Sequence, residues 1–227
     1  MKIAVMGTSN TGKTTYIKDF LKQWTMYKTP EKSYREVLKE KGLPHSKNST
    51  EQTQALIMNF LIDQITENAD EKFMIFDRCV VDCLAYSTWL HINGKISEKF
   101  LDEQRILVNH ALRLYDVIFF IPLTKAAKID IEDDKFREID PIFREEIDNI
   151  FKAFQIAYHK HDGSVFPKED CPAVIEIFGS PEERVKMTEF YIDKDGKVYG
   201  EDDSLINQVI SNHHEGLSLE EVNALKG

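Results

Sequence analysis

An eight-residue motif close to the N-terminus narrows what this chain can become. Residues 7–14 read GTSNTGKT and match G-x-x-x-x-G-K-[S/T] at every fixed position. Apolar Ile3–Met6 precedes the motif as a short strand, and an amphipathic pattern follows from Lys13 to Trp24. Such a turn aims backbone N–H groups and a helix N-terminus at phosphate oxygens. The motif therefore predicts a phosphate-binding loop for ATP or GTP.

The residue types in this loop also predict its cofactors. Lys13 should reach the β- and γ-phosphates, and the Thr14 hydroxyl should ligate Mg²⁺. We therefore expect ATP and Mg²⁺ as cofactors, with ATP or GTP left open as the donor. The residues expected to hold the nucleotide are Gly7, Asn10, Thr11, Gly12, Lys13, Thr14 and Thr15.

Short apolar segments alternate with helical patterns along the rest of the chain, which indicates a parallel sheet covered on both faces. The predicted class is an α/β three-layer sandwich with a five-stranded parallel sheet. Its later strands are expected at 26–28, 73–76, 117–121 and 173–177, and its helices at 55–65, 80–91, 97–115, 141–158 and from 181. Predicted helix starts are Ser49 with Gln52, Asp140 with Pro141, and Ser180 with Glu183. We expect a kinase-like domain over 1–190 with a lid at about 123–140, and a β-hairpin with a helical tail over 191–227.

Composition limits the classes of partner. The formal net charge of −10 lacks the basic excess typical of proteins that bind long nucleic acids, so such partners are disfavoured without being excluded. The sequence contains no run of 18 apolar residues and therefore predicts no membrane span. Its first apolar run is better explained as a buried strand than as a signal peptide. We therefore expect a cytoplasmic protein, and a homodimer is left open. Cys79, Cys83 and Cys171 form no CxxC pair, which favours reduced thiols over a metal site.

A second motif follows the apolar segment 73–76. Asp77 comes directly after that predicted strand, at the edge where a parallel sheet presents its ligand crevice. Its carboxylate could hold Mg²⁺ or orient the attacking oxygen, and the alternative is a cap for the helix that follows. Arg78 could clamp a substrate or a transferring phosphate, and the alternative is a surface ion pair.

Asp77 and Arg78, followed by Asp82, Ala85 and Tyr86, resemble the D-R-x-x-x-[S/D]-x-x-A-Y signature of the thymidylate kinase and deoxynucleoside kinase group, in particular its bacterial and phage AAA-domain or NadR-like branch. The resemblance covers about residues 1–190 and includes the turn at 179–184. It implies that Asp77 is the base or a metal-side carboxylate and that Arg78 contacts the acceptor. Asp82 departs from the small hydroxyl residue usual in thymidylate kinases. That departure disfavours thymidylate and leaves an acceptor with a free hydroxyl open.

The same resemblance implies a basic lid and an acceptor pocket. A charged stretch follows the predicted strand at 117–121, and we expect at least one arginine there to contact the transferring phosphoryl group. The acceptor pocket is expected within residues 30–60. The candidate catalytic residues are Lys13, Asp77, Arg78, Arg137 and Arg144, with Arg137 preferred in the lid, and the candidate substrate-binding residues are Arg35, Gln52, Gln54, Arg78, Asp82 and Tyr86. For each lid arginine, the alternative is a solvated helix face.

These inferences together predict an enzyme that transfers the γ-phosphoryl group of ATP to a nucleoside, a nucleoside monophosphate or a related small molecule. Two alternatives stay open. One is a kinase of a hydroxymethyl pyrimidine within DNA, and the other is a P-loop NTPase that acts as a switch on a protein partner.

Overall fold

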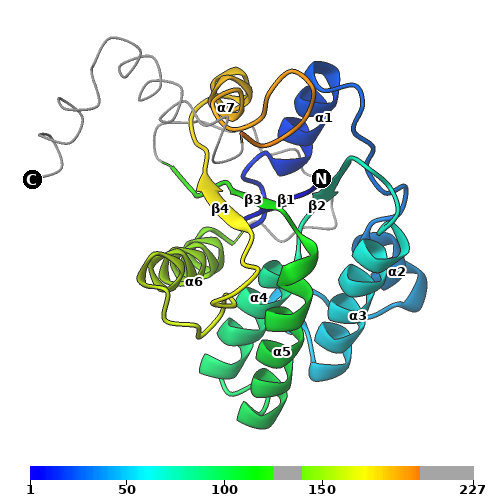
Figure 1. Ribbon diagram of the computed structural model, residues 1–227. Coiled ribbons are helices and arrows are strands. Elements are labelled where there is room, and N and C mark those ends of the chain that lie inside the picture. Colours follow the sequence, from blue (N-terminus) through cyan, green and yellow to red (C-terminus); the bar gives the residue numbers. More distant parts are fainter. Residues whose placement is uncertain (125–139, 200–227) are drawn as a thin grey trace, which may run out of the picture.

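The computed structural model describes residues 1–124 and 140–199 (Figure 1). At its centre lies a parallel sheet in the order β2-β1-β3-β4. In register, Ile3 of β1 pairs with Ile75 of β2 and with Val117 of β3. All carboxyl ends therefore meet at one edge of the sheet. The strands are β1 (Lys2–Met6), β2 (Met74–Asp77), β3 (Val117–Phe120) and β4 (Ala173–Glu176).

Helices cover both faces of this sheet, as the alternation of apolar segments predicted. Ile3 and Val5 of β1 pack towards α1 and α7, whereas Ala4 and Met6 pack towards the cluster that contains α3 to α6. This division gives the three layers. The helices are α1 (Lys13–Gln23), α2 (Tyr34–Lys41), α3 (Glu51–Glu67), α4 (Val80–Ile92), α5 (Glu98–Ala111), α6 (Pro141–Lys160) and α7 (Pro181–Thr188), with 3₁₀ turns η1 (Ser46–Asn48) and η2 (Leu112–Leu114).

The segment 26–28, which was expected to be a strand, forms no strand and contributes a single β-bridge to the sheet. Within the described ranges the sheet has four strands, and Lys28 forms only an isolated parallel bridge to Met74. Tyr27 instead turns its ring onto Phe20, with the ring centroids 5.0 Å apart. Pro30 then follows, and a residue without an N–H group cannot extend the ladder.

Two of the three predicted helix starts are correct. Asp140 caps α6 with Pro141 in its first turn, and Ser180 forms a capping box with Glu183 at α7. The prediction at Ser49 was wrong, because Thr50 is the cap: its hydroxyl accepts from the Thr53 N–H at 3.3 Å. The helix consequently starts at Glu51, four residues before the predicted apolar run.

The segment predicted as a C-terminal hairpin forms a turn that Gly196 closes by donating to the Asp193 carbonyl, and an isolated antiparallel bridge between Ile192 and Val198. The predicted tail helices at 204–225 lie outside the described residues. In the ranges that the structure covers, no helix has the length and apolar character needed to span a membrane.

Candidate functional site

The loop between β1 and α1 has the curl that the motif predicted. Gly7 has φ +142°, and a Cβ there would lie 2.5 Å from the Ile121 carbonyl oxygen, so only glycine fits. Gly12 has φ +83° and ends the loop at the first turn of α1. The buried Lys13 ammonium lies across the loop and donates to the carbonyls of Gly7, at 2.7 Å, and Thr8, at 2.5 Å. Burial, followed by the charge of Arg78, lowers the pKa of Lys13 well below its usual value.

Asp77 lies beside this loop because β2 pairs with β1. The Thr14 hydroxyl donates to Asp77 Oδ2 at 2.8 Å. Asp77 is not the cap of the following helix, since α4 has Cys79 at that position. Burial works to raise the pKa of Asp77, but the charges of Lys13 and the neighbouring arginines outweigh it and lower that pKa. The carboxylate is therefore ionised at neutral pH.

Thr14 and Asp77 fit a Mg²⁺ site. Mg²⁺ takes oxygen ligands, and here a hydroxyl and a carboxylate lie side by side at the end of the phosphate loop. Asp77 Oδ1 is buried without a hydrogen-bond partner in the described part of the chain. A buried carboxylate oxygen without a donor is what a metal-bound water or a cation would satisfy.

Arg78 and Asp82 form a buried ion pair, with Arg78 Nη1 2.9 Å from Asp82 Oδ1 and side chains that are 5% and 2% exposed. Arg78 adopts φ +90°, an uncommon conformation for a residue with a side chain. Asp82 also accepts from the N–H groups of Gly7, at 3.3 Å, and Cys79, at 3.0 Å. Burial raises the pKa of Asp82, although Arg78 counteracts it. Asp82 of α4 thus bonds the start of the phosphate loop and the turn at Arg78 and Cys79. Because both side chains of the ion pair are buried, the surface ion pair considered for Arg78 is excluded.

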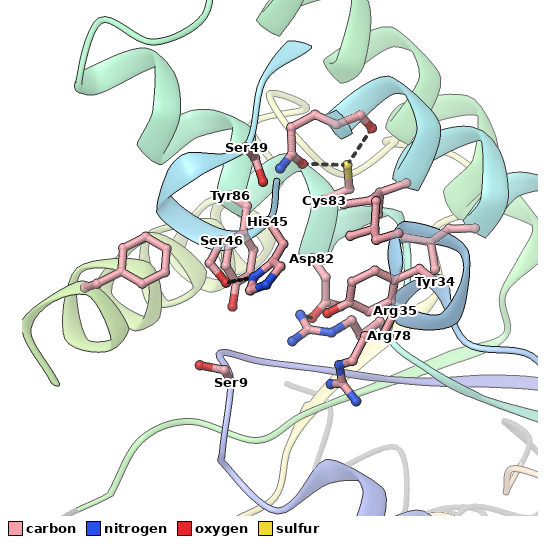
Figure 2. Close-up of a pocket in the computed structure, with 15 residues that line it drawn as sticks. Ser9, Tyr34, Arg35, His45, Ser46, Ser49, Arg78, Asp82, Cys83 and Tyr86 are labelled. Atoms are coloured by element: carbon pink, nitrogen blue, oxygen red, sulfur yellow. Dashed lines mark hydrogen bonds and ion pairs between the residues drawn. The ribbon is translucent and has the colours of Figure 1, made fainter. Parts of the chain in front are cut away.

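A cavity opens next to this ion pair (Figure 2). Ser9 of the phosphate loop lines one side, and Tyr34 and Arg35 of α2 line another. Arg78 lies between the rings of Tyr34 and Tyr86, 5.4 and 5.5 Å from their centroids. Helices α3, α4 and α6 and the η1 region complete the wall, so side chains from six separate segments meet beside the phosphate loop.

The structure brings together most of the predicted substrate-binding residues. Five of them line the cavity: Arg35, Gln54, Arg78, Asp82 and Tyr86. Gln54 Oε1 accepts from Cys83 Sγ at 3.2 Å and from Ser87 Oγ at 3.4 Å. Gln52 is exposed on α3 and does not line this cavity. Thr15 is likewise exposed, on α1. The cysteines are free, and no group of potential metal ligands that includes them occurs in the described ranges.

The predicted lid arginines differ in outcome. Arg137 lies outside the described residues. Arg144 lies on α6 and contacts the phosphate loop, where its Nε donates to the Ser9 carbonyl and its Nη2 to the Asn10 carbonyl, both at 3.1 Å. Arg144 is therefore not on a solvated face, which was the alternative.

Sequence reasoning did not single out Arg184. This residue of α7 is 2% exposed, and its Nη1 donates to the Thr11 carbonyl at 2.7 Å. The turn at 179–184 was predicted as a helix start and as part of the family resemblance, but without a role for Arg184. An arginine among the charged residues of a short helix carries no signal of burial, so only the packing of α7 against α1 reveals the contact.

A protein-family profile described as an AAA domain matches residues 2–170. Among curated proteins no significant match was found. Among solved structures, deoxyadenosine kinase from M. mycoides with bound dATP matches with a TM-score of 0.58 at 15% identity, covering 95% of this chain and 100% of that chain.

Two further solved structures share the fold. The NadR protein in complex with NR matches with a TM-score of 0.54 at 15% identity, over 96% of this chain and 52% of that chain. Thymidylate kinase from Candida albicans matches with a TM-score of 0.51 at 15% identity, over 82% of this chain and 88% of that chain. The chain belongs to the AAA-domain family that the profile describes, and its fold is that of the P-loop nucleoside and nucleotide kinases.

Proposed function

We propose that this protein is an ATP- and Mg²⁺-dependent kinase that transfers the γ-phosphoryl group to a hydroxyl of a nucleoside, a nucleoside monophosphate or a related small molecule. The observation that carries the proposal is the cavity that shares Ser9 with the phosphate loop and is bordered by Arg78 and Asp82. An NTPase switch requires a nucleotide site and a positioned water, but it does not require a second cavity of this kind. The solved kinases of the same fold act on nucleosides and nucleotides, which agrees with the proposal.

The chemistry assigned to each group follows from its surroundings. Phosphoryl transfer requires mainly that donor and acceptor be aligned and that the spreading negative charge be stabilised. The loop amides and Lys13 hold the donor. Asp77, which is ionised, orients or accepts the proton of the acceptor hydroxyl. Mg²⁺, when bound by Thr14 and Asp77, neutralises charge on the phosphates.

The charges in the cavity favour an acceptor hydroxyl over an acceptor phosphate. Asp82 neutralises Arg78 within the buried pair, which leaves Arg35 as a cation that lines the cavity and has no ion pair with a carboxylate of the described residues. A nucleoside or nicotinamide riboside needs no cationic clamp, whereas a monophosphate would depend on Arg35. We therefore place nucleoside-like acceptors first.

A screen for acceptor-dependent ADP release tests the proposal. Purified protein with MgATP is offered nucleosides, nucleoside monophosphates, nicotinamide riboside and DNA. At least one small molecule should stimulate ADP release above the rate without acceptor. If DNA alone stimulated release, the polymer kinase would be correct instead. ATP turnover that no acceptor stimulates would support the NTPase switch and overturn the proposal.

A further inference from the structure

The phosphate loop has a donor for every one of its carbonyls. Lys13 bonds the carbonyls of Gly7 and Thr8, and the Tyr16 N–H bonds that of Gly12 at 2.9 Å. Of the three carbonyls between them, those of Ser9 and Asn10 accept from Arg144, and that of Thr11 accepts from Arg184. Two arginines from different helices therefore hold the middle of the loop.

Holding a carbonyl also aims the amide that follows it. In a planar trans peptide the C=O of one residue and the N–H of the next point in opposite directions. None of the described peptides is cis. Fixing the Ser9, Asn10 and Thr11 carbonyls consequently turns the next N–H groups to the other side of the loop. Of these, the N–H groups of Thr11 and Gly12 have no acceptor among the described residues.

Each arginine is fixed by its own helix. Arg184 belongs to α7, whose Thr188 hydroxyl bonds the Arg184 carbonyl at 2.9 Å and the Tyr16 hydroxyl of α1 at 2.7 Å. These bonds connect α7, and with it Arg184, to α1, the helix that follows the phosphate loop.

Arg144 belongs to α6, where the ring of the preceding residue, Phe143, packs edge-on against Trp89 with centroids 4.7 Å apart. Further along α6, Asp148 accepts from the Leu123 N–H at 2.8 Å, which ties the helix to the chain just after β3. The two guanidinium groups thus reach the loop from separate helices, each of which is bonded to a neighbouring segment.

We propose that Arg144 and Arg184 form a clamp that holds the loop amides in the direction of the donor phosphates. In this clamp both arginines act through the loop backbone and are positioning residues, not groups that touch the transferring phosphoryl. The inference rests on the proposed function only in taking the loop ligand to be a nucleotide. The clamp orients N–H groups of the loop and does not contact the transferring phosphoryl. Its effect on affinity should therefore be the same for a nucleoside diphosphate and a triphosphate.

Nucleotide affinity measured without turnover tests the clamp. The dissociation constants for MgADP and MgATP are compared by calorimetry between the wild type and the variants Arg144→Met and Arg184→Met. Loss of a hydrogen bond from a charged donor should weaken both nucleotides by similar factors of roughly ten to a hundred. Arg184→Lys keeps one N–H donor and should recover part of the affinity. Arg105→Met removes a surface partner of Asp102 and is the matched control, with unchanged affinity.

The same variants separate the clamp from direct catalysis. If Arg144 touched the transferring group, Arg144→Met would lower kcat by about 10³ or more while MgADP affinity stayed normal. The clamp predicts the reverse, a rise in the MgADP dissociation constant with kcat at saturating ATP changed less than about threefold. Unchanged MgADP affinity in both methionine variants would overturn the proposal.

Two controls keep that outcome interpretable. Arg184 is buried, so its variants are first checked by thermal unfolding without nucleotide. Arg144 is only partly exposed yet lies outside the core clusters, and its variant remains testable if Arg184→Met fails to fold. If the wild type binds MgADP but phosphorylates no acceptor, the proposed function fails while the clamp can still be measured.

Discussion

The phosphate loop and the neighbouring cavity are built on opposite principles. The loop is six residues of backbone between β1 and α1, and its shape follows from glycines at Gly7 and Gly12 and one lysine. The cavity is a meeting of side chains from α2, α3, α4, α6, η1 and the loop itself. A backbone site recognises what all nucleotides share, whereas a side-chain site distinguishes one acceptor from another. Under the proposed function, this difference would let proteins of one fold act on different acceptors.

The largest effect should come from the loop, through Lys13→Ala. The ammonium is the only charged group of the motif, and it is buried between loop carbonyls. Its removal should lower kcat/KM for MgATP by on the order of 10³. Steady-state kinetics measure this, and a variant that kept a tenth or more of the wild-type value would break the assignment of the loop.

Asp77→Asn tests the junction between the two regions. The amide keeps the size of the side chain but loses the proposed base and metal ligand, so kcat should fall by a factor on the order of 10². MgADP affinity should change far less. Equal turnover in the variant and the wild type would show that Asp77 serves only to bond Thr14.

Removing the buried ion pair tests how much it stabilises the wall of the cavity. Arg78→Met leaves the Asp82 carboxylate buried without its cation, and removing one partner of such a pair costs about 3–5 kcal/mol in the free energy of unfolding. Urea denaturation measures the loss. Arg105→Met breaks an exposed pair and should cost less than about 1 kcal/mol. Similar losses in both variants would contradict the structural role of the buried pair.

Substitutions at two glutamines of α3 test whether the cavity binds the acceptor. Gln54 lines the cavity. Its side-chain oxygen Oε1 accepts hydrogen bonds from Cys83 and Ser87, so its side-chain nitrogen Nε2 can donate to a ligand. Gln54→Leu should raise the acceptor KM about tenfold with little change in the KM for ATP. Gln52→Leu, on the exposed side of α3, should leave both unchanged. If the two variants behaved alike, the cavity would not be the acceptor site.

The smallest expected effect is a dependence of MgADP affinity on pH. Burial lowers the pKa of Lys13, and the protonated form binds phosphate, so MgADP affinity should decline at a lower pH than the ordinary lysine pKa of about 10.4. The decline is at most about tenfold per pH unit, since one proton is involved.

Protein stability should change in the opposite sense. Between the lowered pKa of Lys13 and its ordinary value, the unfolded chain binds more protons than the folded chain, so the free energy of unfolding without nucleotide rises with pH. Calorimetric titrations and urea denaturation across pH 7–10 check both trends. A MgADP affinity that stayed flat to pH 10 would contradict them.

The two regions also differ in how far the sequence predicts them. The loop, its strand and its helix were predicted correctly, because a motif of contiguous residues encodes them. Asp77 was predicted to lie beside the loop because parallel strands end at one edge, and the pairing of Val5 with Asp77 confirms this placement. Local rules are enough for features of this kind.

Features that depend on packing between distant segments were predicted less well. Gln52 and Gln54 are two residues apart, and nothing in the sequence tells which one faces the cavity. Arg184 was missed because its contact with Thr11 spans 173 residues of chain. The edge strand at 26–28 was overestimated, since apolar residues alone do not reveal that Pro30 ends the pairing.

Transfer of labelled phosphoryl from [γ-³²P]ATP shows whether the protein is a kinase. In a single turnover with an acceptor found in the screen, we expect the label on an acceptor hydroxyl in an amount equal to the ADP formed. Label recovered only as inorganic phosphate, whatever acceptor is present, would show that the protein hydrolyses ATP and that the cavity does not hold a phosphoryl acceptor.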